Sequence, residues 1–366
     1  MYDYCKHIHE EGSQSSRFSI FQDVIYLGYF TWNDQSVHSL DAKSVTTEML
    51  MSCLDDSQLE KPPVIYFNRA VEKVKKNGSL QLLPETSSEG WSYFKDSTIR
   101  GIPSALVLHV ARKRSMDLKQ LDFLIGGSVL KVLGDRHVKR RHGSEETDRY
   151  IIQLIRGVIS IRRHSNYAWS ISEVGQQFER LMTGRALDAP DDPKRFENLT
   201  FQNINDEDGK HRFAVLFFAE LDGQISKQSS SSWSNAATSE SDEFSTVEVK
   251  ISNRNFWKCD LPLQMISTNA TILYHGIKYR NGDTFKLQDI KEYDVKTLVE
   301  RNNMLQIRKI ESNILRSLKE IKEKNLKENE MYFLQFDDNN DMTLEPATEE
   351  CRDCQINQEV KEQLLP

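Results

Sequence analysis

Two acidic residues stand together at the end of a strongly apolar segment. The stretch LFFAELDGQI, residues 216–225, places Glu220 and Asp222 directly after residues that a folded chain would bury. In an extended strand, residues two apart point to the same side, so both carboxylates would face the same way. Carboxylates that close together repel each other unless a cation lies between them. Either the strand ends in solvent at this point, or the two acids hold a metal ion.

A second set of charged residues follows in the next predicted strand. The alternating stretch STVEVKIS, residues 245–252, places Glu248 and Lys250 on one side and turns Val249 toward the core. A carboxylate on one strand with Glu-x-Lys on its neighbour is the pattern of metal-dependent PD-(D/E)xK nucleases. Hard oxygen ligands bind Mg²⁺ or Mn²⁺, and the lysine orients a water and stabilises charge on the phosphate. The pair of strands therefore predicts a metal site for phosphate chemistry.

A third acidic position comes from a predicted amphipathic helix over residues 169–182. In its segment GQQFE, Glu179 follows Gly175 by about one turn, and glycine permits close approach of a helix to a sheet. Each of these short patterns is by itself common on half-exposed strands and helices. Their ordered combination predicts that four carboxylates and one lysine converge.

The elements that position these residues predict a mixed α/β domain with a β-sheet core flanked by helices. We expect a flexible N-terminus over residues 1–17, one domain over 18–346 and a flexible C-terminal tail over 347–366. The serine-rich segment at 227–244 has too little apolar surface to pack, so we expect a disordered insertion there. The sequence shows no internal repeat and no linker that divides the domain.

Patterns of apolar residues predict the individual elements. Residues 102–133 are typical of helix, interrupted by two adjacent glycines, and residues 150–165 of a strand pair or one bent strand. An Asn-Gly turn predicts that residues 272–279 pair with 284–287 in a hairpin. Residues 295–326 predict a long charged helix, for which we expect a solvated face, and residues 331–346 a closing hairpin.

Composition limits the possible functions. The 366-residue chain has a net charge of −7, so no overall basic field indicates nucleic-acid binding. Two local basic clusters, residues 112–114 and 136–142, could contact an RNA backbone or could be solvated helix ends. Five scattered cysteines do not form a disulfide framework, and no apolar run is typical of a signal or membrane segment. We expect a reducing compartment, the nucleus or the cytoplasm, and no membrane association.

Four motifs in this order resemble the DXO family of decapping nucleases, which act on the 5′ ends of RNA. The motifs are GQQFE at 175–179, AELDG at 219–223, VEVK at 247–250 and the glutamine of LPLQM at 261–265. The flanking segments LGYFTWNDQ, LDFLIGGSVLKVL and MYFLQFDDNNDMTLEP extend the resemblance over about residues 18–346. It implies a PD-(D/E)xK-nuclease-like fold and removal of incomplete caps or of pyrophosphate from RNA 5′ ends.

The resemblance also implies roles for individual residues. Lys250 and Gln264 would hold the scissile phosphate and its water. Catalysis would depend on Glu220, Asp222, Glu248 and Lys250. The ligands of Mg²⁺ or Mn²⁺ would be the carboxylates of Glu179, Glu220, Asp222 and Glu248 and the carbonyl of Val249.

Three positions of the substrate site depart from the family pattern. Gly126 stands where the family has an arginine that grips the substrate phosphate, and glycine cannot replace a bidentate cation. Ser36 stands in place of a second arginine, and Arg100 in place of a glutamate. The expected metal ligands are kept, whereas the residues that would bind the substrate phosphate are altered. This combination resembles the Cutoff-type branch of the family in the insect germline piRNA pathway.

This likeness implies a nuclear protein with weakened or lost decapping activity. Such a protein would bind and protect nascent piRNA precursor transcripts and would have nuclear or chromatin protein partners. Two other interpretations stay open. One is an active metal-dependent decapping nuclease or pyrophosphohydrolase that has moved its clamp, for instance to Arg100 or residues 136–142. The other is a protein-interaction scaffold with a vestigial site.

Overall fold

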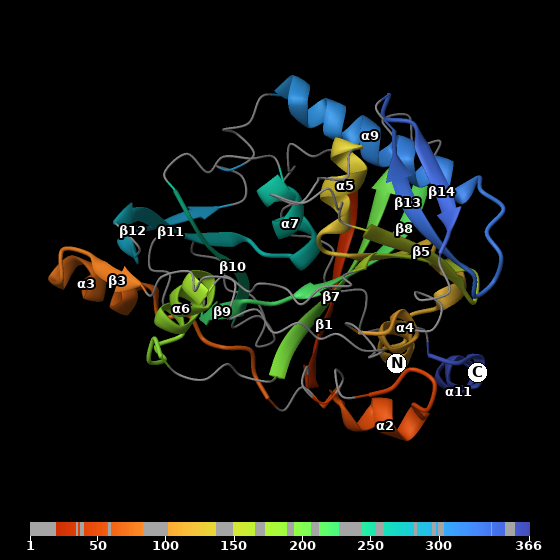
Figure 1. The fold of residues 1–366 in the computed structure, drawn as a ribbon, viewed down its shortest axis with the longest axis horizontal. Coiled ribbons are helices and arrows are strands. Elements are labelled where there is room, and N and C mark those ends of the chain that lie inside the picture. The colour runs from red at the N-terminus through yellow and green to blue at the C-terminus, as the bar shows by residue number, and fades with distance from the viewer. Residues whose placement is uncertain are drawn as a thin grey trace.

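Two β-sheets, flanked by helices, form the centre of the protein (Figure 1). They are seen in a computed structural model of the chain. Among the residues it describes, no helix is long and apolar enough to cross a membrane. The described residues are 20–33, 36, 40–57, 60–82, 102–136, 149–164, 173–188, 194–205, 212–226, 244–253, 260–281, 284–294, 298, 304–337, 339–347 and 356–366.

The larger sheet has nine strands in the order β14-β13-β5-β6-β4-β8-β7-β1-β2. It is mixed, because β4 runs parallel to both of its neighbours, β6 and β8, while the other pairs are antiparallel. Ligands of such sheets bind at the carboxyl ends of parallel strands. The strands are β1 (Phe21–Asn33), β2 (Leu54–Asp55), β4 (Phe123–Gly126), β5 (Arg149–Ile155), β6 (Val158–His164), β7 (Lys194–Asn205), β8 (Arg212–Glu220), β13 (Met331–Phe336) and β14 (Met342–Pro346).

The smaller sheet has five strands in the order β3-β12-β11-β10-β9. Strand β8 of the larger sheet ends at Glu220, and β9 of the smaller sheet begins at Gly223, so two residues join the sheets. The predicted hairpin across the Asn-Gly turn is confirmed by the pairing of β11 with β12. The strands are β3 (Leu80–Leu82), β9 (Gly223–Ser226), β10 (Phe244–Ser252), β11 (Ile272–Asn281) and β12 (Thr284–Asp294).

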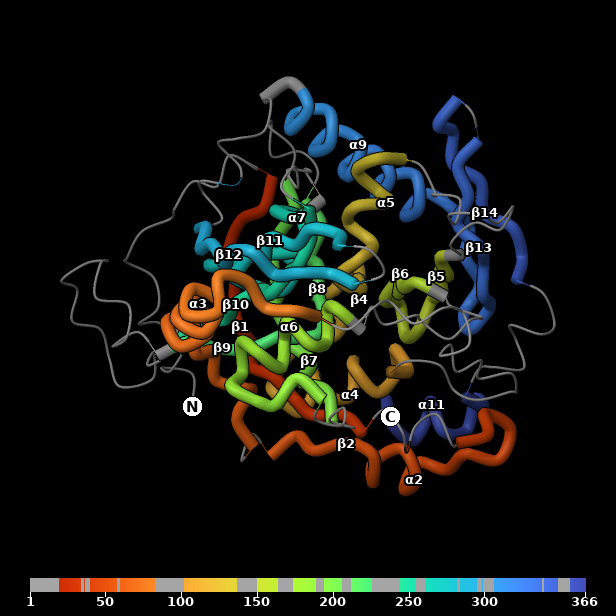
Figure 2. The backbone as a smooth tube through the Cα atoms, turned by 60° about the vertical axis from the view of Figure 1, so that its left-hand side comes forward, coloured from red at the N-terminus to blue at the C-terminus, as the bar shows by residue number. Residues whose placement is uncertain are grey.

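Helices cover both faces of the larger sheet and also pack on the smaller one. Figure 1 shows α5, α7 and α9 on one side of the larger sheet and α2, α4 and α11 on the other, each set above its own apolar core. Figure 2 shows α3 and α6 beside β9 to β12, where they close a third core. The helices are α2 (Thr47–Ser52), α3 (Phe67–Lys76), α4 (Ser104–Lys113), α5 (Val129–Asp135), α6 (Glu173–Met182), α7 (Asp260–Thr268), α9 (Met304–Lys322) and α11 (Gln358–Leu364), with a short 3₁₀ turn at Leu118–Gln120.

The predicted helical region 102–133 is only partly helical. Helix α4 is present, but the stretch FLIG forms the central strand β4, with all four residues buried. A parallel strand covered by helices on both faces is a continuous apolar run, which cannot be distinguished from a buried helix by periodicity. Of the stretch LDFLIGGSVLKVL, only the segment after the two glycines forms helix, as α5.

The other predicted elements fit the structure more closely. The segment 150–165 is a strand pair, β5 with β6, rather than one bent strand, and the closing hairpin is β13 with β14. Helix α9 exposes charged residues as predicted, but it also buries one apolar face against α5. That face consists of Ile307, Ile310, Ile314, Leu318 and Ile321.

The end of the chain is folded where we expected a flexible tail. Asn357 caps α11 by accepting a hydrogen bond from the Val360 N–H at 2.8 Å. Leu364 is fully buried, and its carbonyl oxygen lies 2.7 Å from Nδ1 of His109 on α4. The tail residues 348–355 and the predicted insertion, apart from its last residue Phe244, lie outside the described residues.

Candidate functional site

The candidate site lies where the two sheets join. The connection from β8 to β9 consists of Leu221 and Asp222. Leu221 is buried, and its N–H donates to the Phe196 carbonyl of β7 at 2.8 Å. Asp222 accepts a hydrogen bond from the Val249 N–H of β10 at 2.8 Å. These two bonds fix Asp222 against the strand that carries Glu248 and Lys250.

Lys250 bridges Glu248 of its own strand and Asp222 of the β8–β9 connection. Its Nζ lies 2.6 Å from Oε1 of Glu248 and 3.6 Å from Oδ2 of Asp222. Glu248 is almost fully buried, and its Oε1 also accepts a hydrogen bond from Nε2 of Gln264 on α7 at 2.6 Å. The structure thus brings together Asp222, Glu248, Lys250 and Gln264.

Helix α6 brings Glu179 to the same cluster. Its apolar residues, among them Phe178, pack in the core beneath the smaller sheet. The sheet permits this close packing because β11 has a glycine there: a Cβ on Gly276 would lie 2.8 Å from the Phe178 ring. The charges of Asp222 and Lys250 both act on the carboxyl group of Glu179, so the helix places this acid within electrostatic reach of the cluster.

The electrostatics of the cluster favour a bound cation. Burial, followed by the charge of Asp222, raises the pKa of Glu248 to about 8. Although Glu179 is exposed at the surface, the protein around its carboxyl group and then Asp222 raise its pKa to about 8 as well. Burial alone would lower the pKa of Lys250, but Asp222 and Glu248 outweigh burial and raise it. Glu179 and Glu248 therefore favour the protonated form near neutral pH unless more positive charge arrives.

Glu220 lies at the outer side of the cluster and has a cation of its own. Its Oε2 is 3.0 Å from Nη1 of Arg195, the second residue of β7, and about half of the Glu220 side chain is exposed. Its charge still contributes to the raised pKa values of Glu179 and Glu248. The two acids of the ELD motif therefore contact different partners: Glu220 contacts Arg195, and Asp222 contacts Val249 and Lys250.

The donor set fits a hard divalent cation such as Mg²⁺ or Mn²⁺. Carboxylate oxygens are the ligands that these ions prefer, and the buried Glu248 requires a positive charge to stay ionised near neutral pH. Within the described ranges, however, no three His, Cys, Asp or Glu side chains are already gathered as a metal-binding group. Lys250 and Arg195 provide the positive charge in the structure. The residues that would hold the ion are Glu179, Glu220, Asp222 and Glu248, with the carbonyl of Val249.

Gly126 and Gly127 lie at the end of β4, beside β8. A Cβ on Gly126 would lie 3.5 Å from the ring of Phe218, an ordinary contact, and Gly126 does not have a positive φ. A Cβ on Gly127 would lie 2.8 Å from Cβ of Ala219, which is too close. The backbone therefore requires glycine at 127 but not at 126.

The other predicted substrate positions receive less support. Ser36 lies beyond the end of β1, where its N–H donates to Oδ1 of Asn33 at 2.9 Å. Asn33 pairs with Lys194, next to Arg195, so Ser36 is at the side of the sheet that carries the site. Arg100 lies outside the described residues.

Two arginines of the basic clusters, Arg114 and Arg136, have structural roles. Arg136 is 1% exposed and donates to the Asn340 carbonyl, to Ser317 and to Glu320. Arg114 donates to two carbonyl groups of β1 and contacts Asp56. These contacts contradict the interpretation of Arg136 as a moved phosphate clamp, and residues 137–142 lie outside the described part of the chain.

Sequence analysis missed two features near the site. Arg195 lies in a charged segment, KRFEN, and only the pairing of β7 with β8 reveals its contact with Glu220. His275 of β11 pairs in register with Lys250, is buried, and lies with Nε2 2.8 Å from the hydroxyl of Ser252. Burial, followed by Lys291, lowers the pKa of His275 to about 4, so it is neutral at physiological pH.

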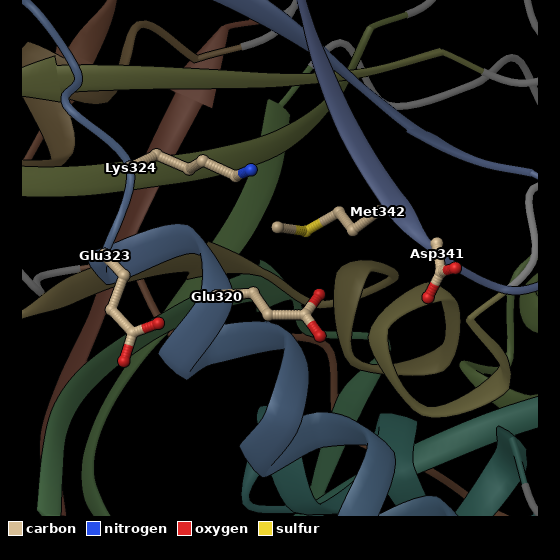
Figure 3. A pocket seen from close by; sticks show the side chains of 5 residues that line it. All are labelled: Glu320, Glu323, Lys324, Asp341 and Met342. Atoms are coloured by element: carbon tan, nitrogen blue, oxygen red, sulfur yellow. The ribbon is translucent and has the colours of Figure 1, made fainter.

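A cavity of about 360 Å³ lies away from this cluster, between the end of α9 and the β13–β14 hairpin (Figure 3). Its lining acid Glu320 already contacts Arg136 and Arg316, and Asp341 contacts Arg316. These ion pairs join α9 to its neighbours and explain the polar lining structurally. The cavity is lined by Glu320, Glu323, Lys324, Asp341 and Met342.

Comparison with known proteins supports the fold. No protein-family model and no curated protein matches the chain. Rai1 of Scheffersomyces stipitis in complex with (3'-NADP)+ and calcium ion is similar, with 12% identity, a TM-score of 0.55, and coverage of 93% of this chain and 96% of that chain. A second structure of Rai1 from this organism has 11% identity, a TM-score of 0.52, and coverage of 95% and 98%. The predicted mixed α/β fold is confirmed, and it is a fold like that of Rai1.

Proposed function

We propose that this chain is a DXO-family protein that binds the 5′ ends of RNA at a site dependent on divalent cations. The observation that carries the proposal is the convergence of Asp222, Glu248, Lys250 and Gln264 from three elements at the junction of the two sheets. The order of these residues resembles the family motifs. The similar Rai1 structure contains a nucleotide and a divalent cation, which supports the same ligand classes for this chain.

The residues present divide the work at such a site. A bound Mg²⁺ or Mn²⁺ would polarise a phosphate and lower the pKa of a water molecule. Lys250 and the amide of Gln264 are positioned beside Glu248, so they can hold a phosphate oxygen and orient the attacking water. Asp222 accepts a hydrogen bond from the Val249 N–H and lies 3.6 Å from Lys250, so it holds Lys250 beside the β8–β9 connection.

Hydrolysis by this site is weak in our proposal because Gly126 carries no phosphate-binding side chain. The protein then binds the 5′ end of the RNA but cleaves it slowly. This behaviour is expected of a nuclear protein that protects nascent transcripts in the manner of Cutoff-type members. The piRNA pathway, the nucleus and chromatin-associated partners belong to this proposal through the sequence resemblance.

The second candidate is an active decapping nuclease or pyrophosphohydrolase. The complete Asp222–Lys250–Glu248–Gln264 arrangement favours it, because these groups make the expected contacts with one another. The difference between the two candidates is quantitative: both bind metal and 5′ ends, and only the second turns over at a rate typical of the family.

The test measures binding and turnover separately. Purified protein is titrated with Mn²⁺ and Mg²⁺ by calorimetry and then incubated with 5′-labelled triphosphate, capped and monophosphate RNAs. We expect metal binding, and preference for 5′-phosphorylated over 5′-hydroxyl RNA, with slow release of pyrophosphate or cap. Glu248→Gln removes the buried charge with little change in shape and is expected to abolish metal binding. Fast release would favour the second candidate. Absence of both metal binding and 5′-end preference would contradict both and favour a scaffold.

A further inference from the structure

The ion pair between Arg195 and Glu220 joins an arginine to an acid of the candidate metal site. The guanidinium Nη1 lies 3.0 Å from Oε2 of Glu220, with 32% of the Arg195 side chain and 52% of the Glu220 side chain exposed. The backbone positions of both are fixed: Arg195 pairs with the buried Trp32 of β1, and the Phe196 carbonyl holds Leu221 at 2.8 Å. The backbone of Arg195 is therefore fixed at the edge of the site, while its guanidinium group is partly exposed to solvent.

This ion pair is easily exchanged. Exposed pairs of this kind shift an equilibrium by no more than about fivefold, because water solvates both partners well. A divalent cation beside Glu220 would compete with the guanidinium for the same carboxylate and would repel it. Arg195 would then lie next to a cationic centre, where a phosphate anion can contact both the guanidinium and the metal ion. The planar guanidinium can bind phosphate through two parallel hydrogen bonds.

Three other arginines of the larger sheet and its helices are less suitable. Arg136 is buried in contacts with α9, and Arg114 is bound to the backbone of β1. Arg212 starts β8, eight residues before Glu220, and lies 3.6 Å from Asp23. Arg195 combines a fixed backbone, an exposed charged group and direct contact with Glu220.

We propose that Arg195 exchanges Glu220 for the terminal phosphate of the RNA when the divalent cation binds, and so adds a phosphate contact of its own on the Glu220 side of the site. This inference rests on the proposed function. It makes the Arg195–Glu220 pair a coupling element: metal binding releases the arginine for phosphate, and phosphate binding releases the acid for metal. Such coupling is reciprocal, so each ligand strengthens the other by the same factor.

The exchange predicts opposite effects of one substitution on the two ligands. In Arg195→Ala, Glu220 has no competing guanidinium, so Mn²⁺ alone should bind as tightly as in the wild type or up to about fivefold more tightly. Binding of a short 5′-monophosphate RNA in the presence of Mn²⁺ should weaken by roughly 10- to 100-fold, the loss of a charge-assisted bidentate contact. Arg195→Lys keeps the charge but not the fork, so it should restore part of the phosphate affinity.

The experiment uses the full chain, with calorimetry for Mn²⁺ and fluorescence anisotropy for 5′-monophosphate and 5′-hydroxyl RNAs of one sequence. Arg212→Ala is the matched control, because it removes an exposed arginine from the same sheet far from the acids. Thermal unfolding checks that each variant is folded, and Arg195→Lys replaces Arg195→Ala if the latter is not. Equal behaviour of the Arg195 and Arg212 variants would overturn the inference and leave the proposed function standing. A wild type that neither binds Mn²⁺ nor distinguishes the two RNAs would overturn the proposed function itself.

Discussion

Under the proposed function, replacement of Gly126 by arginine should raise metal-dependent hydrolysis of 5′-triphosphate RNA. The residue ends β4 in register with Phe218, two residues before Glu220 on the neighbouring strand. A Cβ there would meet the Phe218 ring at 3.5 Å and the Arg162 Cα at 3.9 Å, both ordinary contacts. The backbone at Gly126 does not have a positive φ, so it accepts an L residue. The added side chain starts beside the Phe218 ring, two residues before Glu220 on β8.

The expected size of the gain comes from the new phosphate contact. A charge-assisted hydrogen bond to phosphate contributes about 1.5–3 kcal/mol, which corresponds to roughly one to two decades in rate if the contact forms in the transition state. Gly127→Arg is the matched control, because its Cβ would lie 2.8 Å from Cβ of Ala219. That variant adds the same charge one residue away, but it forces β8 and the start of α5 apart and should lower stability without raising activity.

The assay is pyrophosphate release from 5′-triphosphate RNA with saturating Mn²⁺, at equal concentrations of folded protein. We expect Gly126→Arg to exceed the wild type by at least several-fold, and Glu220→Ala in the same background to remove the gain. A folded Gly126→Arg protein that binds Mn²⁺ and stays as slow as the wild type would refute the reasoning, because the clamp would then not be what limits the site.

Three further predictions concern stability. The pKa values of Glu248 and Glu179 are raised from 4.5 in the unfolded chain to about 8 in the folded one. Between pH 4.5 and about 8 the folded metal-free protein therefore binds more protons than the unfolded chain. Its free energy of unfolding should then fall as pH rises through this range. Urea unfolding at several pH values checks this slope, which Glu248→Gln should reduce; a stability that rises over the window would contradict the prediction. Lys250→Met should destabilise the metal-free protein by about 1–3 kcal/mol, because it leaves Glu248 uncompensated at a site that is only partly open to water. Thermal unfolding should then show a larger stabilisation by Mn²⁺ in that variant than in the wild type, and an equal shift would argue against charge compensation by Lys250. Leu364→Ala should cost about 2–5 kcal/mol of unfolding free energy because the side chain is fully buried, whereas a free C-terminal end would show almost no change in denaturant unfolding.

The cluster could be predicted from the sequence because its residues lie in short motifs whose spacing has a local meaning. Glu248 and Lys250 share one side of a strand whatever the rest of the fold does, and Asp222 follows an apolar run that had to be a buried strand. The lateral contacts could not be predicted in the same way. Arg195 meets Glu220 only because β7 and β8 pair in one register, and register between strands depends on the whole sheet.

The errors in the fold have similar causes. Strand β4 is apolar at every position because helices cover both of its faces, so no alternation distinguished it from helix. The terminal helix α11 is short and polar over most of its length. Only its contacts with α4 and α2 bury Val360 and Leu364, and those contacts join segments about 250 residues apart. Contacts between segments so far apart in the sequence cannot be predicted from a local pattern.

The short connection between β8 and β9 makes the site sensitive to movement of the whole protein. Glu220 belongs to the larger sheet and Glu248 to the smaller one, and only Leu221 and Asp222 join β8 to β9. A cation held by both acids would cross-link the two sheets at this connection. Substitutions in either core that shift one sheet against the other would then change metal affinity without touching a ligand, and slower hydrogen exchange of the Leu221 and Val249 amides on metal addition would report that the connection has become more rigid.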